Sequence, residues 1–326
     1  MTPGITPDRS ARLRRVKLAA LMSDRGLAAE HVTTTGLCAA TAAEQAWVLL
    51  DGEPGRGLGG AVAYAASRSA AEVHVVAEAG TGVLARRADA FALPIHVWHH
   101  RDRTLIPAIA EPLPAVPPPR AEHLALSDVI RTGGADPVVE HGVVAGEVDG
   151  LEVCRVVDDP LTGEVRLEVG VGAHDRETFQ LLHGNLPTVE ALRTVVASVA
   201  AHRRPGADPH PLNLLAAERS LRQRVINEPG LIGALALRPA DPPVARRNLK
   251  DTVPCVAIAT IGTAEVVAVF SAGVDLDVVP FATDARLAHH LHDAVIVLPR
   301  RDALDVQRRI AGQLHRPIDI VGLASI

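Results

Sequence analysis

The stretch from Gly55 to Gly60 carries the clearest chemical pattern in the sequence. Its letters, GRGLGG, satisfy the spacing G-x-G-x-x-G, and they lie between an apolar run at 47–51 and a helix-like stretch at 58–69. Glycines in that position let backbone N–H groups approach a phosphate at a helix N-terminus, and an acidic residue after the next strand can accept ribose hydroxyls. The sequence therefore predicts a site for a phosphorylated cofactor at Gly55, Gly57, Gly60 and Glu78.

The residues just before these glycines favour a different interpretation. Four residues, DGEP, separate the strand from the first glycine, and Asp51 and Glu53 would repel a phosphate. The alternative is a flexible glycine-rich turn without a ligand. The arrangement resembles the Rossmann dinucleotide-binding fold, and that resemblance implies a topology only; the identity of any cofactor stays open.

A pair of aspartates occupies the corresponding place in a second, similar stretch near the C-terminus. Asp275 and Asp277 are two residues apart and would share a face in an extended chain, which could hold a divalent cation. Asp277 also precedes a helix-like stretch that Pro280 enters in its first turn, so capping of that helix explains the carboxylate as well.

Carboxylates also gather in the middle of the chain, where a metal-dependent nuclease is an alternative. Glu147 and Asp149 share a strand face, with Glu152 and Glu168 nearby. Nucleases of the restriction-endonuclease kind need an acid together with acid-x-Lys on adjacent strands, and no such lysine follows here. Lys250 or an arginine would have to replace it.

Basic side chains and histidines offer two more candidate sites. The helix expected at 211–228 carries arginines whose planar head groups suit phosphates, although a solvated face with pairs such as Glu218 to Arg222 is the simpler interpretation. Histidines at the ends of expected elements favour solvated side chains over a metal site, because no acid-His signature accompanies them. The residues are Arg219, Arg222 and Arg224, and His96, His99, His100, His289, His290 and His292.

Two segments with a similar order of apolar runs and helix-like stretches must position these residues. Residues 46–98 and 265–322 both read as β-α-β-α-β, and RRADAFALPIHV (86–97) matches RRIAGQLHRPIDIV (308–321) best. The fold class predicted is therefore α/β, with two related β-α-β-α-β (Rossmann-like) units and a β-hairpin and helical insertion between them. We expect the two units to share one sheet, because each exposes two unpaired edges.

The expected domains follow from this pattern and from proline density. They are an N-terminal α/β unit at 1–110, a proline-rich linker at 111–135, a β-hairpin with helices at 136–250, and a C-terminal α/β unit at 251–326. Within the first unit, TTT (33–35) is suited to an edge strand and AATAAEQ (39–45) to a short helix.

Composition limits the function classes. The net charge of −5 gives no overall attraction to nucleic acid or anionic lipid, although a local patch that binds nucleic acid remains open. Lys17 and Lys250 are the only lysines, and arginine with abundant Ala, Val, Gly and Pro indicates a high-GC bacterial genome. Three scattered cysteines and the lack of a long apolar run predict a cytoplasmic protein without a membrane segment.

Three functions remain open from the sequence. The first is binding of a nucleotide or another phosphorylated ligand at the glycine-rich turn, and the second is a metal-dependent nuclease or phosphodiesterase that uses the clustered carboxylates. The third is a non-catalytic scaffold that self-associates, for which a homodimer is compatible. Catalytic residues are not identifiable, and whether the chain is an enzyme is left open.

Overall fold

The chain divides into two compact units in the computed structural model. The structure describes residues 7–183, 188–204, 207–208, 210–246, 251 and 253–324. Unit 1 comprises Met1–Leu113, Val274–Asp284 and Leu304–Ile320; unit 2 comprises Pro114–Gly273, Ala285–Ala303 and Val321–Ile326. The first boundary therefore lies inside the proline-rich stretch that was expected to link domains.

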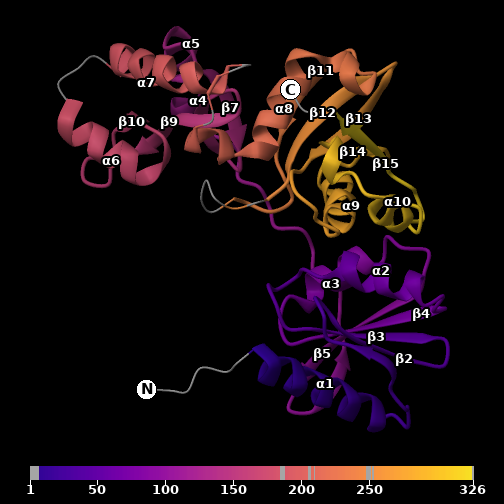
Figure 1. The fold of residues 1–326 in the computed structure, drawn as a ribbon. Helices are drawn as coiled ribbons and strands as arrows, with labels where there is room; N and C mark the ends of the chain where they lie inside the picture. Colours follow the sequence, from indigo (N-terminus) through magenta and orange to yellow (C-terminus); the bar gives the residue numbers. More distant parts are fainter. Residues whose placement is uncertain are drawn as a thin grey trace. The chain divides into compact units, whose positions relative to one another are not determined.

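A six-stranded mixed sheet forms the centre of unit 1, with strands in the order β1-β2-β3-β4-β5-β6 (Figure 1). The segment β3-β4-β5 is parallel, while β2 and β6 join it through antiparallel pairs. One face packs against α1, and α2 and α3 contact the strands from the opposite face (Figure 1). The bounds are α1 Pro7–Ser23, β1 Glu30–Thr33, β2 Cys38–Ala42, β3 Gln45–Leu50, α2 Leu58–Ser67, β4 Glu72–Ala77, α3 Thr81–Ala88, β5 Ile95–Arg101 and β6 Thr104–Pro107.

The short helix expected at 39–45 is wrong, since those residues lie in two strands and the turn between them. Cys38–Ala42 is β2, and it pairs antiparallel with β3 from Cys38 opposite Leu49 to Ala42 opposite Gln45. Alanine favours helices locally, but β2 is paired with β1 and β3 inside the sheet, and its buried residues Cys38, Ala40 and Ala42 pack against α1, where small side chains fit and pairing overrides propensity.

An antiparallel sheet in unit 2 has the strand order β10-β9-β8-β7. The Asp149-Gly150 turn, with φ of 46° and 77°, joins β8 to β9 in the tight hairpin that a right-handed strand twist favours. One face of the sheet packs against α5 and α7 through Ile130, Leu192 and Val199. The bounds are α4 Ala121–Leu124, α5 Ser127–Thr132, β7 Asp136–Glu140, β8 Val143–Val148, β9 Leu151–Asp158, β10 Val165–Val169, α6 Gly172–His183 and α7 Thr188–Arg203.

Two expectations about this region need correction. The stretch expected as a linker to residue 135 contains α4 and α5, so its extended part ends at Arg120. The single helix expected at 211–228 is a 3-10 turn, Pro211–Leu214, followed by α8, Ala217–Asn227. Leu215 is extended and Ala216 has a φ of 50°, so the helix is interrupted before α8 begins.

The remaining strands form a five-stranded sheet with the order β11-β12-β13-β14-β15. The hairpin β12–β13 is antiparallel, β13 pairs parallel with β14, and Val225 of α8 packs on one face with Cys255 and Phe270. This sheet and the unit 1 sheet both place an antiparallel hairpin before a β-α-β-α-β segment; that the two segments are duplicates stays a prediction. The single shared sheet expected for them is wrong, because the two segments lie in separate sheets whose strands are paired with hairpins of their own. The bounds are β11 Ala236–Ala240, β12 Cys255–Ile261, β13 Ala264–Phe270, α9 Val278–Ala288, β14 Ala294–Pro299, α10 Asp305–Ala311 and β15 Asp319–Leu323.

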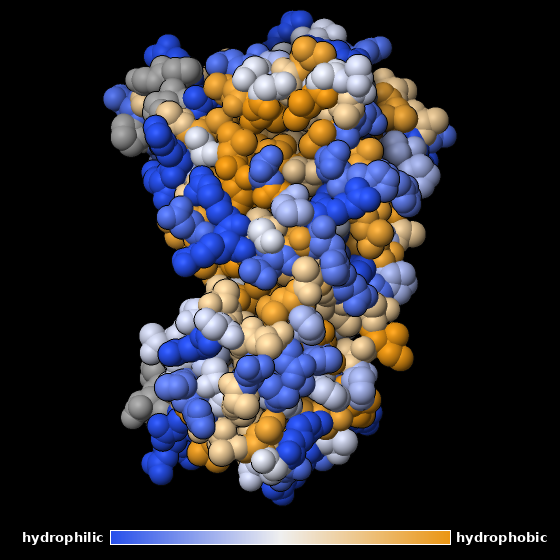
Figure 2. All heavy atoms as spheres, turned by 90° about the vertical axis from the view of Figure 1, so that its right-hand side faces the viewer, coloured by the Kyte–Doolittle hydropathy of each residue, from blue (hydrophilic) through white to orange (hydrophobic). Residues whose placement is uncertain are grey.

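The surface carries hydrophilic and hydrophobic side chains side by side. Figure 2 shows hydrophobic side chains gathered in the upper part of the face it presents, at the height where Figure 1 draws β11–β15, with hydrophilic ones between them. Within the described residues, no helix has both the length and the apolar character that crossing a membrane requires.

Candidate functional sites

The glycine-rich turn binds a carboxylate of its own chain. The N–H groups of Gly57 and Gly59 donate to the two oxygens of Asp277, at 2.6 and 2.8 Å. These N–H groups belong to the start of α2, where unpaired backbone donors and the helix dipole favour negative charge. All three residues belong to unit 1. A phosphate at this helix end would have to displace Asp277.

Gly59 is the glycine whose missing side chain matters most for this contact. A Cβ at Gly59 would lie 2.1 Å from the carbonyl oxygen of Leu276, whereas a Cβ at Gly60 would meet nothing within 4 Å. Gly57 has a φ of 103° and a Cβ there would lie 2.6 Å from the side chain of Leu50. The spacing of the glycines thus fits close approach of the 276–277 backbone.

The aspartate pair is held by hydrogen bonds within unit 1. One oxygen of Asp275 accepts from Arg56 Nη2 at 2.8 Å, and the other accepts from the N–H of Asp277 at 2.9 Å. The side chain of Asp277 therefore caps α2, while its backbone carbonyl accepts the N–H of Phe281 at the start of α9. Every oxygen of the two carboxylates accepts a hydrogen bond from the chain, so a cation between them would compete with these donors.

Glu78 and Gly55 lie on a small cavity of about 200 Å³ at the ends of β3 and β4. Glu78 accepts from Lys17 Nζ at 2.5 Å, and this bond is the main cause that lowers the pKa of Glu78 below its ordinary value. Asp51 and Glu53 line the same cavity, so its carboxylates oppose a phosphate. The structure brings Gly55 and Glu78 together there; Gly57 and Gly60 are not among the lining residues.

A larger cavity of about 710 Å³ lies in unit 2 on the face of the antiparallel sheet that points away from α5 and α7. We call it the sheet cavity. Strands β7, β8 and β9 form its floor, and residues from α6, α8 and the segment before β12 complete its wall. It is lined by apolar Val138, Val143, Ala145, Val171, Gly172, Ala173, Leu215 and Ala245, and by polar Glu140, His141, Glu147, Glu152, Arg155, Arg176, Arg219 and Arg246.

Buried ion pairs cover one part of the sheet cavity. Arg222 donates to Glu140 at 2.6 Å and to Glu147 at 3.1 Å, and it has no exposed surface. Arg219 also pairs with Glu140 and lies 3.1 Å from Glu147. Burial raises the pKa of Glu147, whereas for Glu140 the nearby Arg222 and Arg219 outweigh burial and lower the pKa.

The solvated arginine face expected on this helix is therefore wrong. Arg219 and Arg222 are 6% and 0% exposed, and they pair with Glu140 and Glu147 of β7 and β8, about 80 residues away in sequence. Their carboxylate partners are not the i, i+4 neighbours that the local pattern offered.

A second set of ion pairs involves the carboxylates that suggested a nuclease. Glu152 accepts from Arg155 at 2.9 and 2.8 Å and from Arg176 at 3.0 Å. Glu168 accepts from Arg166 at 2.8 Å. The structure thus brings Glu147 and Glu152 to one cavity, but each is paired with guanidinium groups. Asp149 lies in the β8–β9 turn, and its carbonyl accepts from Arg203.

Arg246 differs from the other arginines of the sheet cavity in its ionic partners. Its Nη2 donates to the carbonyl of Val253 at 2.7 Å, and its Nη1 is buried and, like Nε of Arg176 and Nε of Arg219, has no hydrogen-bond partner among the described residues. Of the described carboxylates, none forms an ion pair with Arg246 within 4.0 Å, whereas Arg155, Arg176 and Arg219 each have one. Arg246 is the guanidinium at this cavity that a ligand could satisfy.

The cysteines do not offer a nucleophile. Cys38, Cys154 and Cys255 are buried and unpaired. Burial raises the pKa of Cys154 and of Cys255 to about 12, which leaves both as thiols at neutral pH.

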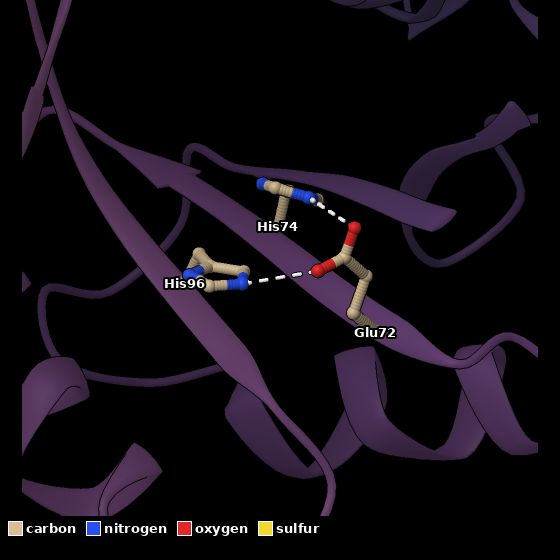
Figure 3. Close-up of side chains that lie close together, drawn as sticks. All are labelled: Glu72, His74 and His96. Carbon is tan, nitrogen blue, oxygen red and sulfur yellow. Dashed lines mark hydrogen bonds and ion pairs between the residues drawn. The ribbon is translucent and has the colours of Figure 1, made fainter. Parts of the chain in front are cut away.

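In unit 1, Glu72, His74 and His96 form a cluster (Figure 3). The sequence analysis identified only His96 as a candidate residue. Glu72 and His74 are two residues apart on β4, and His96 lies opposite His74 on the parallel strand β5. The Nε2 atoms of His96 and His74 lie 3.1 and 3.5 Å from the two oxygens of Glu72. In the sequence, the alternation E-V-H indicates that Glu72 and His74 lie on the same face of a strand. That His96 lies beside them follows only from the register in which β4 pairs with β5.

Both tryptophans of the chain surround this cluster. The ring of Trp47 stacks on His74 with 4.2 Å between centroids, and Trp98 Nε1 donates to His74 Nδ1 at 3.1 Å. Burial lowers the pKa of His74, so the ring is neutral at pH 7. His99 lies outside the cluster, and His100 contacts Glu78.

Comparison of the chain with models of known protein families, with curated proteins and with solved structures gave no match. The function therefore has to be argued from the geometry alone.

Proposed function

We propose that the sheet cavity of unit 2 binds a small organic molecule with an apolar body and one anionic head group, a carboxylate or a phosphate. The cavity volume of about 710 Å³ falls in the range typical of small-molecule sites. Its wall combines an apolar surface with a few charged side chains, which is the usual composition of such sites.

The observation that carries the proposal is the state of Arg246. A buried guanidinium nitrogen without a partner costs free energy, and an anion in the cavity would supply both the hydrogen bond and the countercharge. The other arginines that line the cavity are already neutralised by Glu140, Glu147 and Glu152. Their pairing favours a single anionic group on the ligand over a multiply charged one.

This proposal keeps an anionic ligand, as the glycine-rich turn suggested, but moves the site and extends the ligand class to carboxylates. At that turn, Asp277 already accepts the N–H groups that a phosphate would need, whereas Arg246 has no such partner among the described carboxylates. A metal-dependent nuclease is less well supported, because Glu147 and Glu152 are held by arginines, and a metal ion would have to displace those guanidinium groups.

The proposal is tested with a thermal-shift panel on the full chain. Medium-chain carboxylates and aryl phosphates are compared with their neutral amides and alcohols, since a ligand that binds only the native state raises the melting temperature. We expect the anions to stabilise the protein and the neutral analogues to do so more weakly. Equal shifts for both sets, or no shift from any member, would contradict an anion-binding cavity.

Two variants locate the binding site. Arg246→Gln should lower the affinity for the anions by about tenfold or more, the size expected for one charge-assisted hydrogen bond, while the unliganded melting temperature stays close to that of the native chain. Ala145→Leu should fill the cavity floor and reduce binding of the apolar body. Arg238→Gln is the matched control, because Arg238 pairs with Glu265 on the exposed β11 edge and should not affect binding.

A further inference from the structure

His74 contains a buried nitrogen atom that the described part of the chain leaves without a hydrogen bond. The residue is 8% exposed, and its Nε2 lies 3.5 Å from a carboxylate oxygen of Glu72, a contact that Figure 3 marks but that does not meet the geometry of a hydrogen bond. Since Trp98 donates to Nδ1, a neutral His74 must carry its proton on Nε2. A buried donor that makes no hydrogen bond destabilises the fold. Nε2 therefore lacks an acceptor, and it can become a metal ligand once the ring proton has moved to Nδ1.

We propose that Glu72, His74 and His96 bind one divalent transition-metal ion of the zinc class. Their ligand atoms all lie within 4.8 Å of one another, and two of the separations are 3.1 and 3.5 Å. Ligands of a tetrahedral zinc ion lie about 3.4 Å apart when the metal–ligand distances are about 2.1 Å. Small side-chain rotations would bring all three groups to that geometry.

The backbone holds these residues in register. Glu72 and His74 project from the same face of β4, and His96 is the residue of β5 that faces His74 across the parallel ladder. The rings of the two histidines stack with 4.8 Å between centroids. Two strands in the interior of a six-stranded sheet are a rigid support, which limits the entropy lost when a metal binds.

Hydrogen bonds from neighbouring residues orient the carboxylate. Gln45 Nε2 donates to Glu72 Oε1 at 2.6 Å, and Trp47 Nε1 donates to Gln45 Oε1 at 3.1 Å. Outer partners of this kind fix the ligands of metal sites and are part of their affinity. The Oε2 atom of Glu72 faces His96 Nε2, so a metal would replace the proton that they share.

The hydrogen bond from Trp98 to His74 opposes metal binding at the same site. A metal at Nε2 of a neutral His74 moves the ring proton to Nδ1, where it would face the N–H of Trp98. The indole must then turn away, and its hydrogen bond to His74 is lost. Metal binding should consequently change the tryptophan emission, because Trp47 and Trp98 are the only tryptophans and both contact His74.

The ligand set selects the kind of ion. Two imidazoles and one carboxylate suit Zn²⁺, Co²⁺ or Ni²⁺, whereas Mg²⁺ and Ca²⁺ prefer oxygen alone. Three protein ligands leave one position of a tetrahedral ion for water. Glu72 and Gln45 also line an open cavity of about 420 Å³ with Ala43, Glu44, Ala71 and Pro94, which gives water access to that position.

The test measures metal binding by the full chain prepared without a histidine tag. Zn²⁺ is titrated by calorimetry and by tryptophan emission, and Co²⁺ by its visible absorption, which is strong for tetrahedral and weak for octahedral coordination. We expect one equivalent of either ion to bind, with a change in emission and a tetrahedral cobalt spectrum. Mg²⁺ should produce neither signal.

Variants at His96 and Glu72, whose side chains are 47% and 31% exposed, locate the ion. His96→Gln and Glu72→Gln should each weaken Zn²⁺ binding by at least tenfold, the lower end of the effect that even indirect ligand contacts have. His99→Gln, on the same strand and outside the cluster, is the matched control and should bind like the native chain. The proposal is overturned if Zn²⁺ fails to bind with one equivalent, or if binding survives unchanged in His96→Gln and Glu72→Gln.

Discussion

The Gly55–Gly60 turn and the sheet cavity both present donors for an anion, and they differ in whether the chain itself supplies that anion. At the turn, the carboxylate of Asp277 accepts from the N–H groups of Gly57 and Gly59, which a ligand would need. At the cavity, Arg155, Arg176 and Arg219 each pair with a carboxylate, whereas Arg246 pairs with none of the described carboxylates and its Nη1 has no hydrogen-bond partner among the described residues. A motif that can bind a phosphate is therefore a ligand site only where its donors are unoccupied in the folded chain.

The two regions also differ in how much stability depends on the internal pairing. Asp277 joins residues within unit 1 through two backbone bonds, while Arg222 holds two carboxylates away from water in unit 2. A buried charge that loses its partner is much more costly than a lost exposed pair. The predictions below use that difference.

The largest effect is expected for Arg222→Met. Removing a guanidinium with no exposed surface leaves Glu140 and Glu147 buried with one cationic partner fewer, and such changes typically cost about 3–5 kcal/mol. Urea unfolding would measure the loss. Arg238→Met, which breaks the exposed pair with Glu265, should cost less than about 1 kcal/mol. Similar losses in the two variants would show that the buried network does not stabilise unit 2.

A smaller loss is expected for Asp277→Ala, which opens the turn. Two hydrogen bonds to a carboxylate disappear, and the free energy of unfolding should fall by about 2–3 kcal/mol. The freed N–H groups at the start of α2 would then form an anion site, so phosphate or sulfate should recover part of the lost stability in the variant. Glu122→Ala, at a 62% exposed side chain in the helix α4, is the control. A native chain that gains as much from phosphate as the variant would contradict the view that Asp277 fills the site.

The sequence predicted much of the architecture and little of this site chemistry. Apolar runs rich in valine predicted β3, β4, β13 and β14, and glycine and proline marked several of the turns. The bonds between Asp277 and Gly57 span 220 residues, so no local pattern could indicate them. The arginines of α8 looked solvated because Glu218, the one acid of that helix, offered a local partner, whereas strands β7 and β8 provide the actual partners of Arg219.

Substitutions at Gly59 and Gly60 test why the Gly55–Gly60 turn contains glycines, and their expected effects on stability are smaller. Gly59→Ala would push a Cβ against the carbonyl of Leu276 at 2.1 Å, and we expect a loss of about 1–3 kcal/mol as the backbones separate. Gly60→Ala meets nothing within 4 Å in the interior of α2, and it should stabilise the helix by up to about 1 kcal/mol. Chemical denaturation of both variants measures the contrast. A harmless Gly59→Ala would refute close packing as the reason for that glycine.

The smallest effect on binding is expected near His74, whose Nδ1 accepts a hydrogen bond from Trp98 and whose Nε2 has no hydrogen-bond partner among the described residues. Trp98→Phe keeps an aromatic ring next to His74 but removes the N–H that binds Nδ1. The unliganded protein loses about 1 kcal/mol of hydrogen bonding, whereas the metal-bound protein no longer has two N–H groups facing each other. Zn²⁺ should therefore bind about fivefold more tightly to Trp98→Phe, as measured by calorimetry. Tyr64→Phe is the matched control, because it loses a hydrogen bond to the carbonyl of His31, away from the cluster, and should leave the affinity unchanged. Weaker binding in Trp98→Phe would mean that Trp98 supports the metal-bound ring, and that the proton of His74 is not fixed on Nε2 by its indole.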